Sequence, residues 1–274
     1  MKIDLHCHTT ASDGALTPDD LLARGITNGI DMLAITDHDT VAGYDRVRKR
    51  APDGLKLISG VEFSSRWRNR SIHVVGLNFD PAGESVRTGV CRQTRARRER
   101  ARLIAEKLEF LGIHQLLEKA EKHAGDGAIG RPHFAQVLIE NGSARSHQDA
   151  FKRFLGERKP GNVQQVWPAM EEVVDWICNS GGTAVLAHPG RYRLNRTQLV
   201  ELVTEFRSAG GLAMEIFSGN QNTDITQRLV SLCKSAGLLA STGSDFHRPG
   251  QPWAELGRCP PLPGHLTPVW STWS

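Results

Sequence analysis

The sequence predicts an α/β fold with a mainly parallel sheet. Seven short runs rich in apolar residues alternate with amphipathic stretches along the chain of 274 residues. Continuous apolar strands that are joined by helices are typical of a sheet covered on both faces, which occurs in barrels and in doubly wound folds. The length leaves both open, since α/β barrels of this size routinely form one domain.

The composition supports a globular protein. Hydrophobic residues make up 39% of the chain and charged residues 23%, which excludes disordered, collagen-like and coiled-coil proteins. No apolar run reaches the ~18 residues of a membrane helix, so we expect neither a membrane span nor a signal peptide. The five cysteines are odd in number and widely spaced, which disfavours a disulfide framework and a cysteine zinc site. A cytoplasmic location is therefore expected.

The first part of the chain contains four expected strands and two helices. The strands are expected at 2–6, 32–36, 55–60 and 71–77, and the helices at 18–29 and 40–51. The first helix has clear start signals: Thr17 can cap it, Pro18 suits its first position, and Asp19 and Asp20 make its first turn acidic.

The second part resumes the alternation after a long gap. Strands are expected at 183–188, 212–217 and 238–243, and helices at 168–180, 195–209 and 222–236. Between them the sequence is helical and basic, without a convincing strand. We therefore expect one α/β unit built from residues 1–90 and 167–274, with an inserted helical substrate-binding subdomain at 91–166. The proline-containing tail after Arg248 is expected to lie over the barrel as coil, with Trp270 and Trp273 as anchors.

The positive charge is concentrated in one segment. The whole chain has a net charge of +4, and residues 91–110 alone carry seven Lys or Arg against three Glu, 7 − 3 = +4. Within that segment Arg95, Arg98 and Arg102 follow one another at helical spacing and form a cationic stripe that suits phosphate groups. A solvated helix face is the alternative interpretation.

The histidines carry the functional information. Six of the eleven stand at or just beyond the end of an expected strand: His6, His8, His38, His73, His188 and His247. In a parallel α/β fold these strand ends face one rim, where catalytic groups collect. His6 and His8 share one strand face with Cα atoms ~7 Å apart, a span that can converge on one divalent metal.

Acidic residues accompany these histidines. Glu62 can bridge two ions, Asp13 follows on a loop, and Asp245 shares a strand face with His247. Asp37 or Asp39 can orient a ring nitrogen of His38, the usual arrangement around a ligating imidazole, although helix capping is an alternative for both.

In order and spacing, these residues resemble the metal motifs of the polymerase and histidinol phosphatase (PHP) family. The matching residues are His6, His8, Asp13, His38, Glu62, His73, His188, Asp245 and His247. The resemblance covers essentially the whole chain. It implies a distorted seven-stranded (β/α)7 barrel of the amidohydrolase-like group, and seven is also the number of strands expected above.

The resemblance further implies three divalent metal ions. His6, His8, Glu62 and Asp245 would hold one, Glu62, His73 and His188 a second, and Asp13, His38 and His247 a third. Mixed imidazole and carboxylate donors favour Mn²⁺, Zn²⁺ or Fe²⁺ over Mg²⁺ or Ca²⁺, and we expect Mn²⁺. Three carboxylates and three divalent ions leave a charge of about +3, which suits a phosphate dianion and a hydroxide.

Two motifs of the insert, at 130–135 and 150–156, resemble small bacterial members of the family that act on nucleotides and short RNA. They imply a metal-dependent phosphatase that hydrolyses the 3′-phosphate of nucleoside 3′,5′-bisphosphates, such as adenosine 3′,5′-bisphosphate, to the 5′-monophosphate, with a hydroxide generated by the metals. The alternatives are a 5′-to-3′ exoribonuclease on short RNA, a histidinol-phosphate-type phosphatase and, from another class, a non-catalytic nucleic-acid-binding module.

Roles within the site follow from these expectations. Asp13, His38 and His247 are expected nearest the reacting phosphate as the catalytic group. A second phosphate is expected on Arg131, and the further substrate-binding candidates are Arg98, Arg102, His133 and Ser244. No side chain is expected to act as a covalent nucleophile, since strand alternation points Cys7 away from His6 and His8. No membrane and no obligatory protein partner are expected.

Overall fold

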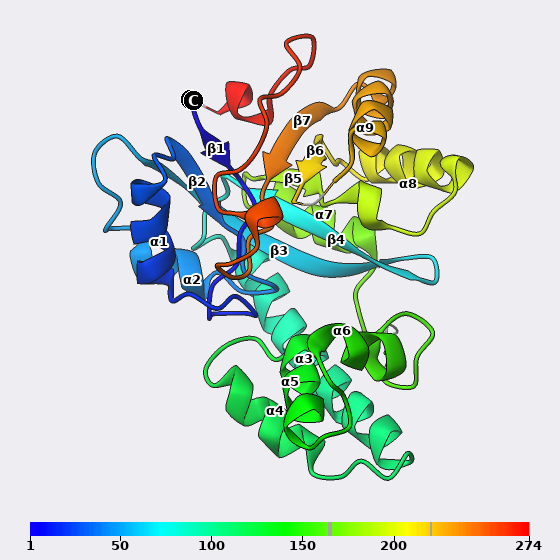
Figure 1. Ribbon diagram of the computed structural model, residues 1–274. Helices are drawn as coiled ribbons and strands as arrows, with labels where there is room; N and C mark the ends of the chain where they lie inside the picture. The colour runs from blue at the N-terminus through cyan, green and yellow to red at the C-terminus, as the bar shows by residue number, and fades with distance from the viewer. Residues whose placement is uncertain (164–165, 220, 274) are drawn as a thin grey trace.

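Seven strands form a nearly closed barrel in the computed structural model, which describes residues 1–163, 166–219 and 221–273 (Figure 1). The strands follow one another around the barrel in chain order. They are β1 (Ile3–Asp4), β2 (Met32–Ile35), β3 (Lys56–Trp67), β4 (Arg70–Leu77), β5 (Thr183–Leu186), β6 (Ala213–Ser218) and β7 (Leu239–Gly243). The expected seven-stranded barrel is confirmed, and the doubly wound alternative is excluded.

The sheet is parallel except at β4. This strand pairs antiparallel with both β3 and β5, because a tight turn at residues 68–69 returns the chain directly from β3. Arg68 takes the left-handed conformation in that turn, at a φ of 52°. Backbone hydrogen bonds from the Leu5 amide to the Thr242 carbonyl (3.2 Å) and from the Asp245 amide to the His6 carbonyl (2.8 Å) join the first strand to the last.

Five helices flank the barrel. They are α1 (Pro18–Thr27), α2 (Ala42–Val47), α7 (Met170–Cys178), α8 (Arg196–Ser208) and α9 (Thr223–Ala236). The side chain of Thr17 accepts a hydrogen bond from the Asp20 amide, so the expected cap of α1 is confirmed. The fully buried Phe63, Val174 and Phe206 belong to the apolar core between the sheet and these helices.

The insert forms a separate helical layer beneath the barrel in Figure 1. It contains α3 (Glu84–Glu109), α4 (Leu116–Ala124), α5 (Arg131–Glu140), α6 (His147–Ala150) and the π-helix η1 (Phe151–Leu155). Ile104, Leu108 and Phe134 belong to an apolar cluster of its own. Helix α3 runs without interruption through residue 91, the expected boundary, so the division into barrel and insert stays a prediction. Residues 164–165 of the expected insert lie outside the described residues.

The tail lies against the barrel. Trp270 and Trp273 pack on the apolar cluster around Ile3 and Val185, and the indole N–H of Trp273 donates to the Thr183 hydroxyl at 3.1 Å. Both are anchors, as expected. Among the described residues, no helix combines the length and the apolar character that a membrane span requires.

Candidate metal centre

All nine residues of the expected metal site meet at one rim of the barrel. His6, His8 and Asp13 follow β1, His38 follows β2, and the remaining members come from β3, β4 and the loops after β5 and β7. His73 reaches the rim differently from the others. It stands in the first half of β4, and it lies at this rim because β4 runs in the opposite direction.

Glu62 lies at the middle of the cluster and is buried. Its Oε1 lies 2.8 Å from ring nitrogens of both His73 and His188. Its Oε2 lies within 3.3 Å of three further imidazole nitrogens, those of His6, His8 and His38. A carboxylate that is shared in this way can bridge two cations through its two oxygens.

The other two carboxylates face further subsets of the imidazoles. Asp245 Oδ1 lies 3.2 Å from Nε2 of His8 and 3.5 Å from Nε2 of His6. Asp13 Oδ1 lies 3.4 Å from Nε2 of His247, and Asp13 Oδ2 lies 3.8 Å from Nε2 of His38. One group of possible ligand atoms combines His8 with the three residues Asp13, His38 and His247.

The polar atoms of the cluster fit divalent cations. Five buried atoms have no hydrogen-bond partner among the described residues: His8 Nδ1, Asp13 Oδ1, His38 Nδ1, Glu62 Oε2 and His188 Nδ1. Such atoms are rare in folded proteins and costly, so several in one place require a cation or a proton between them. The Nε2 atoms of His6 and His8 lie only 3.2 Å apart, and two ring nitrogens at this distance also need a proton or a cation between them. The cluster can therefore hold metal.

The charges of the cluster are strongly coupled. Burial opposes the protonated form of His8, but the carboxylates of Asp245 and Glu62 outweigh it and raise the pKa of His8 to about 10. Burial lowers the pKa of His38 to about 4, which leaves its imidazole neutral. Burial by itself raises the pKa of Glu62, but the surrounding imidazoles hold it well below the ordinary value. Because a metal binds neutral imidazole, binding here displaces protons.

Glu215 on β6 is a residue that the sequence interpretation missed. Its Oε1 accepts a hydrogen bond from Nδ1 of His6 at 2.6 Å, and its Oε2 accepts one from the His188 amide at 2.6 Å. The Nε2 of His6 is then left to face the cluster. The available signal was a single acidic residue inside an otherwise apolar strand, since a buried carboxylate needs a partner.

Neither aspartate beside His38 orients its ring through a hydrogen bond, contrary to expectation. Asp37 instead accepts hydrogen bonds from the Thr9 amide (2.7 Å) and the Ser12 hydroxyl (2.6 Å), and so fixes the loop that carries Asp13. Asp39 turns toward helix α3. Both carboxylates instead satisfy donors that lie far from His38 in the sequence, on the Thr9–Ser12 loop for Asp37 and on β3 and helix α3 for Asp39.

A cavity of about 370 Å³ opens over the cluster. Seven of the nine cluster residues line it, and the insert contributes Arg97, Arg100, Arg131 and Phe151. Arg100 Nε donates to the Val163 carbonyl and Arg131 Nη1 to the Leu155 carbonyl. Neither guanidinium has a carboxylate within ion-pair distance in the part of the chain that the structure describes. The cavity is thus lined by two guanidinium groups without an ion-pair partner in the described part of the chain, in addition to the metal cluster.

The five candidate substrate residues lie in different places. Arg131 lines the cavity, whereas Arg98 is exposed and lines a neighbouring hollow of about 420 Å³. Arg102 is exposed and pairs with Glu99 (2.7 Å) and Glu106 on its own helix. His133 Nδ1 accepts from the Gly130 amide at 3.0 Å, and the buried Ser244 hydroxyl accepts from the Phe246 amide. Their roles in substrate binding stay predictions.

Arg97 and Arg100 face the cavity, and the sequence interpretation missed both. The expected stripe on α3 lies on the exposed side of the helix. The buried side carries Gln93, Arg97, Arg100, Ile104 and Leu108. The available signal was this spacing, since two arginines continue the apolar face of the helix.

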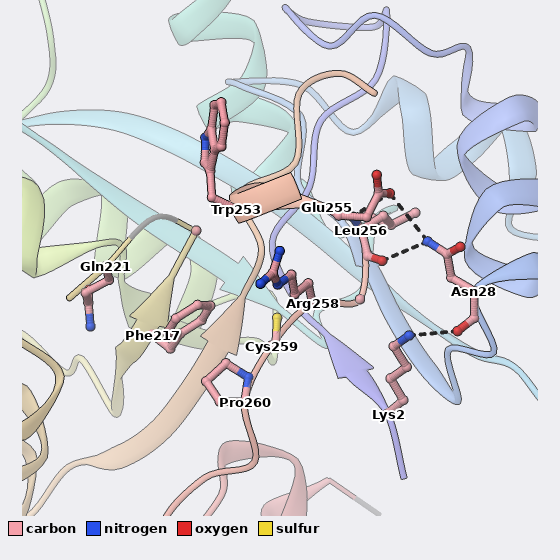
Figure 2. Close-up of a pocket in the computed structure, with 12 residues that line it drawn as sticks. Lys2, Asn28, Phe217, Gln221, Trp253, Glu255, Leu256, Arg258, Cys259 and Pro260 are labelled. Atoms are coloured by element: carbon pink, nitrogen blue, oxygen red, sulfur yellow. Dashed lines mark hydrogen bonds between the residues drawn. The ribbon is translucent and has the colours of Figure 1, made fainter. Parts of the chain in front are cut away.

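A larger hollow of about 730 Å³ lies elsewhere, around Trp253, Arg258 and Cys259 (Figure 2). None of the nine cluster residues lines it. The candidate site is therefore identified by its chemistry and not by the size of its cavity.

Comparisons with known proteins agree with this geometry. The model of the PHP domain family matches residues 4–218. The 5′-3′ exoribonuclease Rnm of Salmonella typhimurium is 46% identical over 98% of this chain and 93% of its own length. The 3′,5′-nucleoside bisphosphate phosphatase of Chromobacterium violaceum is 37% identical over 98% of this chain and 95% of its own length.

Two solved structures share the whole fold. An amidohydrolase from Chromobacterium violaceum, solved with bound sulfate and no metal, has a TM-score of 0.90 at 36% identity and covers 99% of this chain and 95% of its own. A proposed metal-dependent phosphoesterase from Bifidobacterium adolescentis has a TM-score of 0.82 at 28% identity, over 97% and 92% of the two chains. The chain therefore belongs to the PHP family and is a phosphoesterase of that family.

Proposed function

We propose that the chain removes the 3′-phosphate from nucleoside 3′,5′-bisphosphates. One observation supports this most directly: a single cavity is lined both by side chains of the candidate metal cluster and by Arg100 and Arg131, which have no carboxylate within ion-pair distance among the described residues. A nucleotide with two phosphates has one phosphate for the metal cluster and one for the two arginines. The planar guanidinium groups can bind the 5′-phosphate through paired hydrogen bonds while the 3′-phosphate lies at the cluster.

The proposed roles of the cluster residues follow from their exposure. Divalent ions held here would polarise the phosphoryl oxygens and lower the pKa of a water. Asp13, His38 and His247 line the cavity and are partly exposed, as is His73 on β4, whereas His6 and His8 are fully buried. We assign the first three to the position nearest the reacting phosphate, and His6 and His8 to the deeper part of the site.

We further propose three ions, with Mn²⁺ as the native metal. The nine donors can be divided into three sets around the shared Glu62, and the cluster offers several overlapping groups of that kind. The mix of imidazole and carboxylate donors is suited to Mn²⁺, Zn²⁺ and Fe²⁺. Metal analysis of the purified protein tests both the number and the identity of the ions.

The substrate is tested by phosphate release in the presence of manganese. The three substrates are adenosine 3′,5′-bisphosphate, adenosine 5′-monophosphate and a 5′-phosphorylated RNA trimer. We expect the highest kcat/KM for the bisphosphate. A preference for the 5′-monophosphate would contradict the proposal, since that compound has no phosphate at the 3′ position.

The second phosphate is tested with Arg131→Ala. Removal of a charge-assisted hydrogen bond from a binding pocket costs ~2–4 kcal/mol, so kcat/KM for the bisphosphate should fall by roughly 30- to 1000-fold. A monophosphate without the second group should be affected by less than about 5-fold, because it makes no contact there. Equal losses on both substrates would show that Arg131 supports the fold or the cluster.

A 5′-to-3′ exoribonuclease is the second candidate. It is favoured by the Salmonella relative, which is named as such and is more similar to this chain than the bisphosphate phosphatase. Both reactions break the bond between phosphorus and a 3′-oxygen, so one site can serve both. The RNA trimer decides between them, because an exoribonuclease releases nucleoside 5′-monophosphates from it, which chromatography detects, and sets no inorganic phosphate free. A histidinol-phosphate-type substrate fits less well, because its amine would meet two uncompensated arginines.

A further inference from the structure

We infer that Arg97 is a positioning residue that fixes the spacing between the metal cluster and Arg131 through its buried ion pair with Asp39. This inference rests on the proposed function, in which the metal cluster and Arg131 bind two phosphates. Arg97 itself belongs neither to the metal cluster nor to the pair of Arg100 and Arg131. Its side chain connects the barrel, where the cluster lies, with the insert, where Arg131 lies.

The barrel end of this connection begins beside the cluster. Asp39 follows His38, is buried, and takes a left-handed conformation at a φ of 58°. Its amide donates to the Glu62 carbonyl at 2.9 Å, and its Oδ1 accepts from the Ser64 amide at 2.6 Å. The carboxylate of Asp39 is thus fixed to the same two segments that carry His38 and Glu62.

Arg97 completes the connection from helix α3. Its Nε donates to Oδ2 of Asp39 at 2.7 Å, its Nη2 lies 2.6 Å from the same oxygen, and the side chain is only 7% exposed. Its Nη1 donates to the Ile129 carbonyl at 2.9 Å, two residues before Arg131. One guanidinium therefore holds the barrel and the insert loop at a fixed separation.

The insert loop has little freedom beyond this contact. The Ala128 amide donates to the Ala11 carbonyl at 2.9 Å, on the loop that leads to Asp13. A Cβ at Gly130 would lie 3.3 Å from Nη1 of Arg97, so the backbone before Arg131 packs directly against the guanidinium. The His133 ring accepts the Gly130 amide and fixes the start of α5.

The charge of Arg97 is compensated, which distinguishes it from its neighbours. Arg100 and Arg131 line the same cavity without a carboxylate partner in the described part of the chain, whereas Arg97 is neutralised by Asp39. Arg97 is therefore not expected to bind a phosphate itself. A planar guanidinium can serve Asp39 and Ile129 at the same time, but a lysine ammonium on its flexible stem cannot hold that geometry.

The test is Arg97→Lys, which keeps the positive charge beside Asp39 but removes the planar guanidinium that contacts Asp39 and Ile129 together. Since a misplacement of about 1 Å can cost ~100-fold, we expect the KM for adenosine 3′,5′-bisphosphate to rise at least about tenfold. The kcat for p-nitrophenyl phosphate, which carries one phosphate, should stay within about 3-fold, and the manganese content should be unchanged. The preference for 3′,5′- over 2′,5′-bisphosphate should also fall. Equal losses on the two kinds of substrate would overturn the inference.

Two further variants guard against simple destabilisation. Arg92→Lys is the matched control, because Arg92 lies on the same helix and pairs with Glu172 on α7 at an exposed position. It should leave kcat and KM unchanged for both adenosine 3′,5′-bisphosphate and p-nitrophenyl phosphate. Gly130→Ala keeps both charges and has an ordinary negative φ of −147°, but its added methyl group pushes on Arg97. It should raise the KM for the bisphosphate in the same direction as Arg97→Lys, and an unchanged KM would count against the inference.

Binding measured without turnover separates this inference from the proposed reaction. The Kd of adenosine 3′,5′-bisphosphate should rise at least about tenfold in Arg97→Lys. If the wild-type protein binds the bisphosphate but releases no phosphate, the proposed reaction is wrong and the comparison of Kd values still decides the role of Arg97. If the wild-type protein does not bind it, both proposals are wrong.

Discussion

The ring of His6 is oriented by a carboxylate that lies one step outside the cluster. Glu215 holds Nδ1 of His6 and the amide of His188 at the same time. In Glu215→Gln the amide group can accept only one of these hydrogen bonds and presents a donor to the other. Loss of such an orienting partner typically lowers metal affinity or activity by roughly 10- to 100-fold. We expect a fall of that size in metal affinity, measured by titration of chelator-treated protein.

Glu205→Gln provides the control for this prediction. Glu205 is a partly exposed carboxylate that accepts hydrogen bonds from Trp67 and Arg68, neither of which belongs to the cluster. Its substitution should leave metal affinity unchanged. An unchanged affinity in Glu215→Gln as well would show that the orientation of His6 does not depend on this carboxylate.

His38 and Cys7 make opposite predictions for turnover. His38 lines the cavity at the position assigned to the reacting phosphate, so His38→Ala should lower kcat more than it raises KM, by at least about 100-fold. Cys7 is fully buried in an apolar cluster and its thiol donates to the Ala34 carbonyl at 3.1 Å. Cys7→Ala should keep kcat within about 3-fold, because the thiol has no route to the substrate.

Steady-state kinetics on the bisphosphate check both variants. A His38→Ala enzyme with normal kcat and raised KM would remove His38 from the reacting position. Loss of turnover in Cys7→Ala with its metals retained would indicate a covalent nucleophile.

Single residues were predictable where chain position alone determined their place. Five of the histidines lie at the rim because they follow barrel strands, whose ends meet there, whereas Glu62 and His73 lie inside β3 and β4. Glu215 was not predictable in the same way, since it lies inside a strand whose apolar neighbours indicate core. The partners of Asp37 and Asp39 depend on loops that are distant in sequence, and local spacing carries no information about those contacts.

At the scale of one element, helix α3 shows how a shift of one or two residues changes an interpretation. The stripe of Arg95, Arg98 and Arg102 is a correct helical pattern, and its spacing alone does not say which face is buried. The apolar residues in the second half of the helix decide the face. Arg97 and Arg100 are continuous with Ile104 and Leu108, whose burial fixes the rotation of the helix. Charged residues that continue an apolar face are therefore better candidates for a cavity than an isolated charged stripe.

Helix α3 also yields a prediction about packing. It leaves the barrel at Gly89, where a Cβ would lie 2.5 Å from the Trp176 indole of α7. Alanine favours a helix interior by about 1 kcal/mol over glycine, but overpacking of a tight contact typically costs about 1–3 kcal/mol. We expect Gly89→Ala to lower the free energy of unfolding by about 1 kcal/mol net, measured by urea denaturation.

An exposed position on the same helix serves as the reference. Arg95→Ala tests helix propensity without a packing contact and should change the free energy of unfolding by less than about 0.5 kcal/mol. A stabilised Gly89→Ala protein would mean that Trp176 can move aside and that the contact does not hold α3 against the barrel.

At the scale of the whole molecule, the strand count and strand order were predictable but the direction of β4 was not. The apolar runs fixed seven strands, and their separation by helices indicated parallel neighbours. Apolar runs do not encode direction. The signal for reversal was the gap of ten residues between the strands expected to end at 60 and begin at 71, which is too short for a crossover helix of roughly 10–12 residues with its loops. The reversal matters because it places His73 at the rim with the others.

The rim couples metal binding to the stability of the whole barrel. Side chains from β3 and β4 and from the segments after β1, β2, β5 and β7 converge on one cluster, in which five buried polar atoms lack hydrogen-bond partners among the described residues. A metal at about 100 times its Kd stabilises the native state by ~2.7 kcal/mol. For a chain of this size each kcal/mol raises the Tm by about 2–4 °C, so removal of the metal should lower it by about 5–10 °C.

Chelation followed by dialysis should abolish phosphate release and produce this shift in a thermal melt, and added Mn²⁺ should reverse both. Mg²⁺ at equal concentration should restore less of either, because imidazole-rich sites suit it poorly. Chelated protein that kept its full activity and Tm would show that the cluster is satisfied by protons alone.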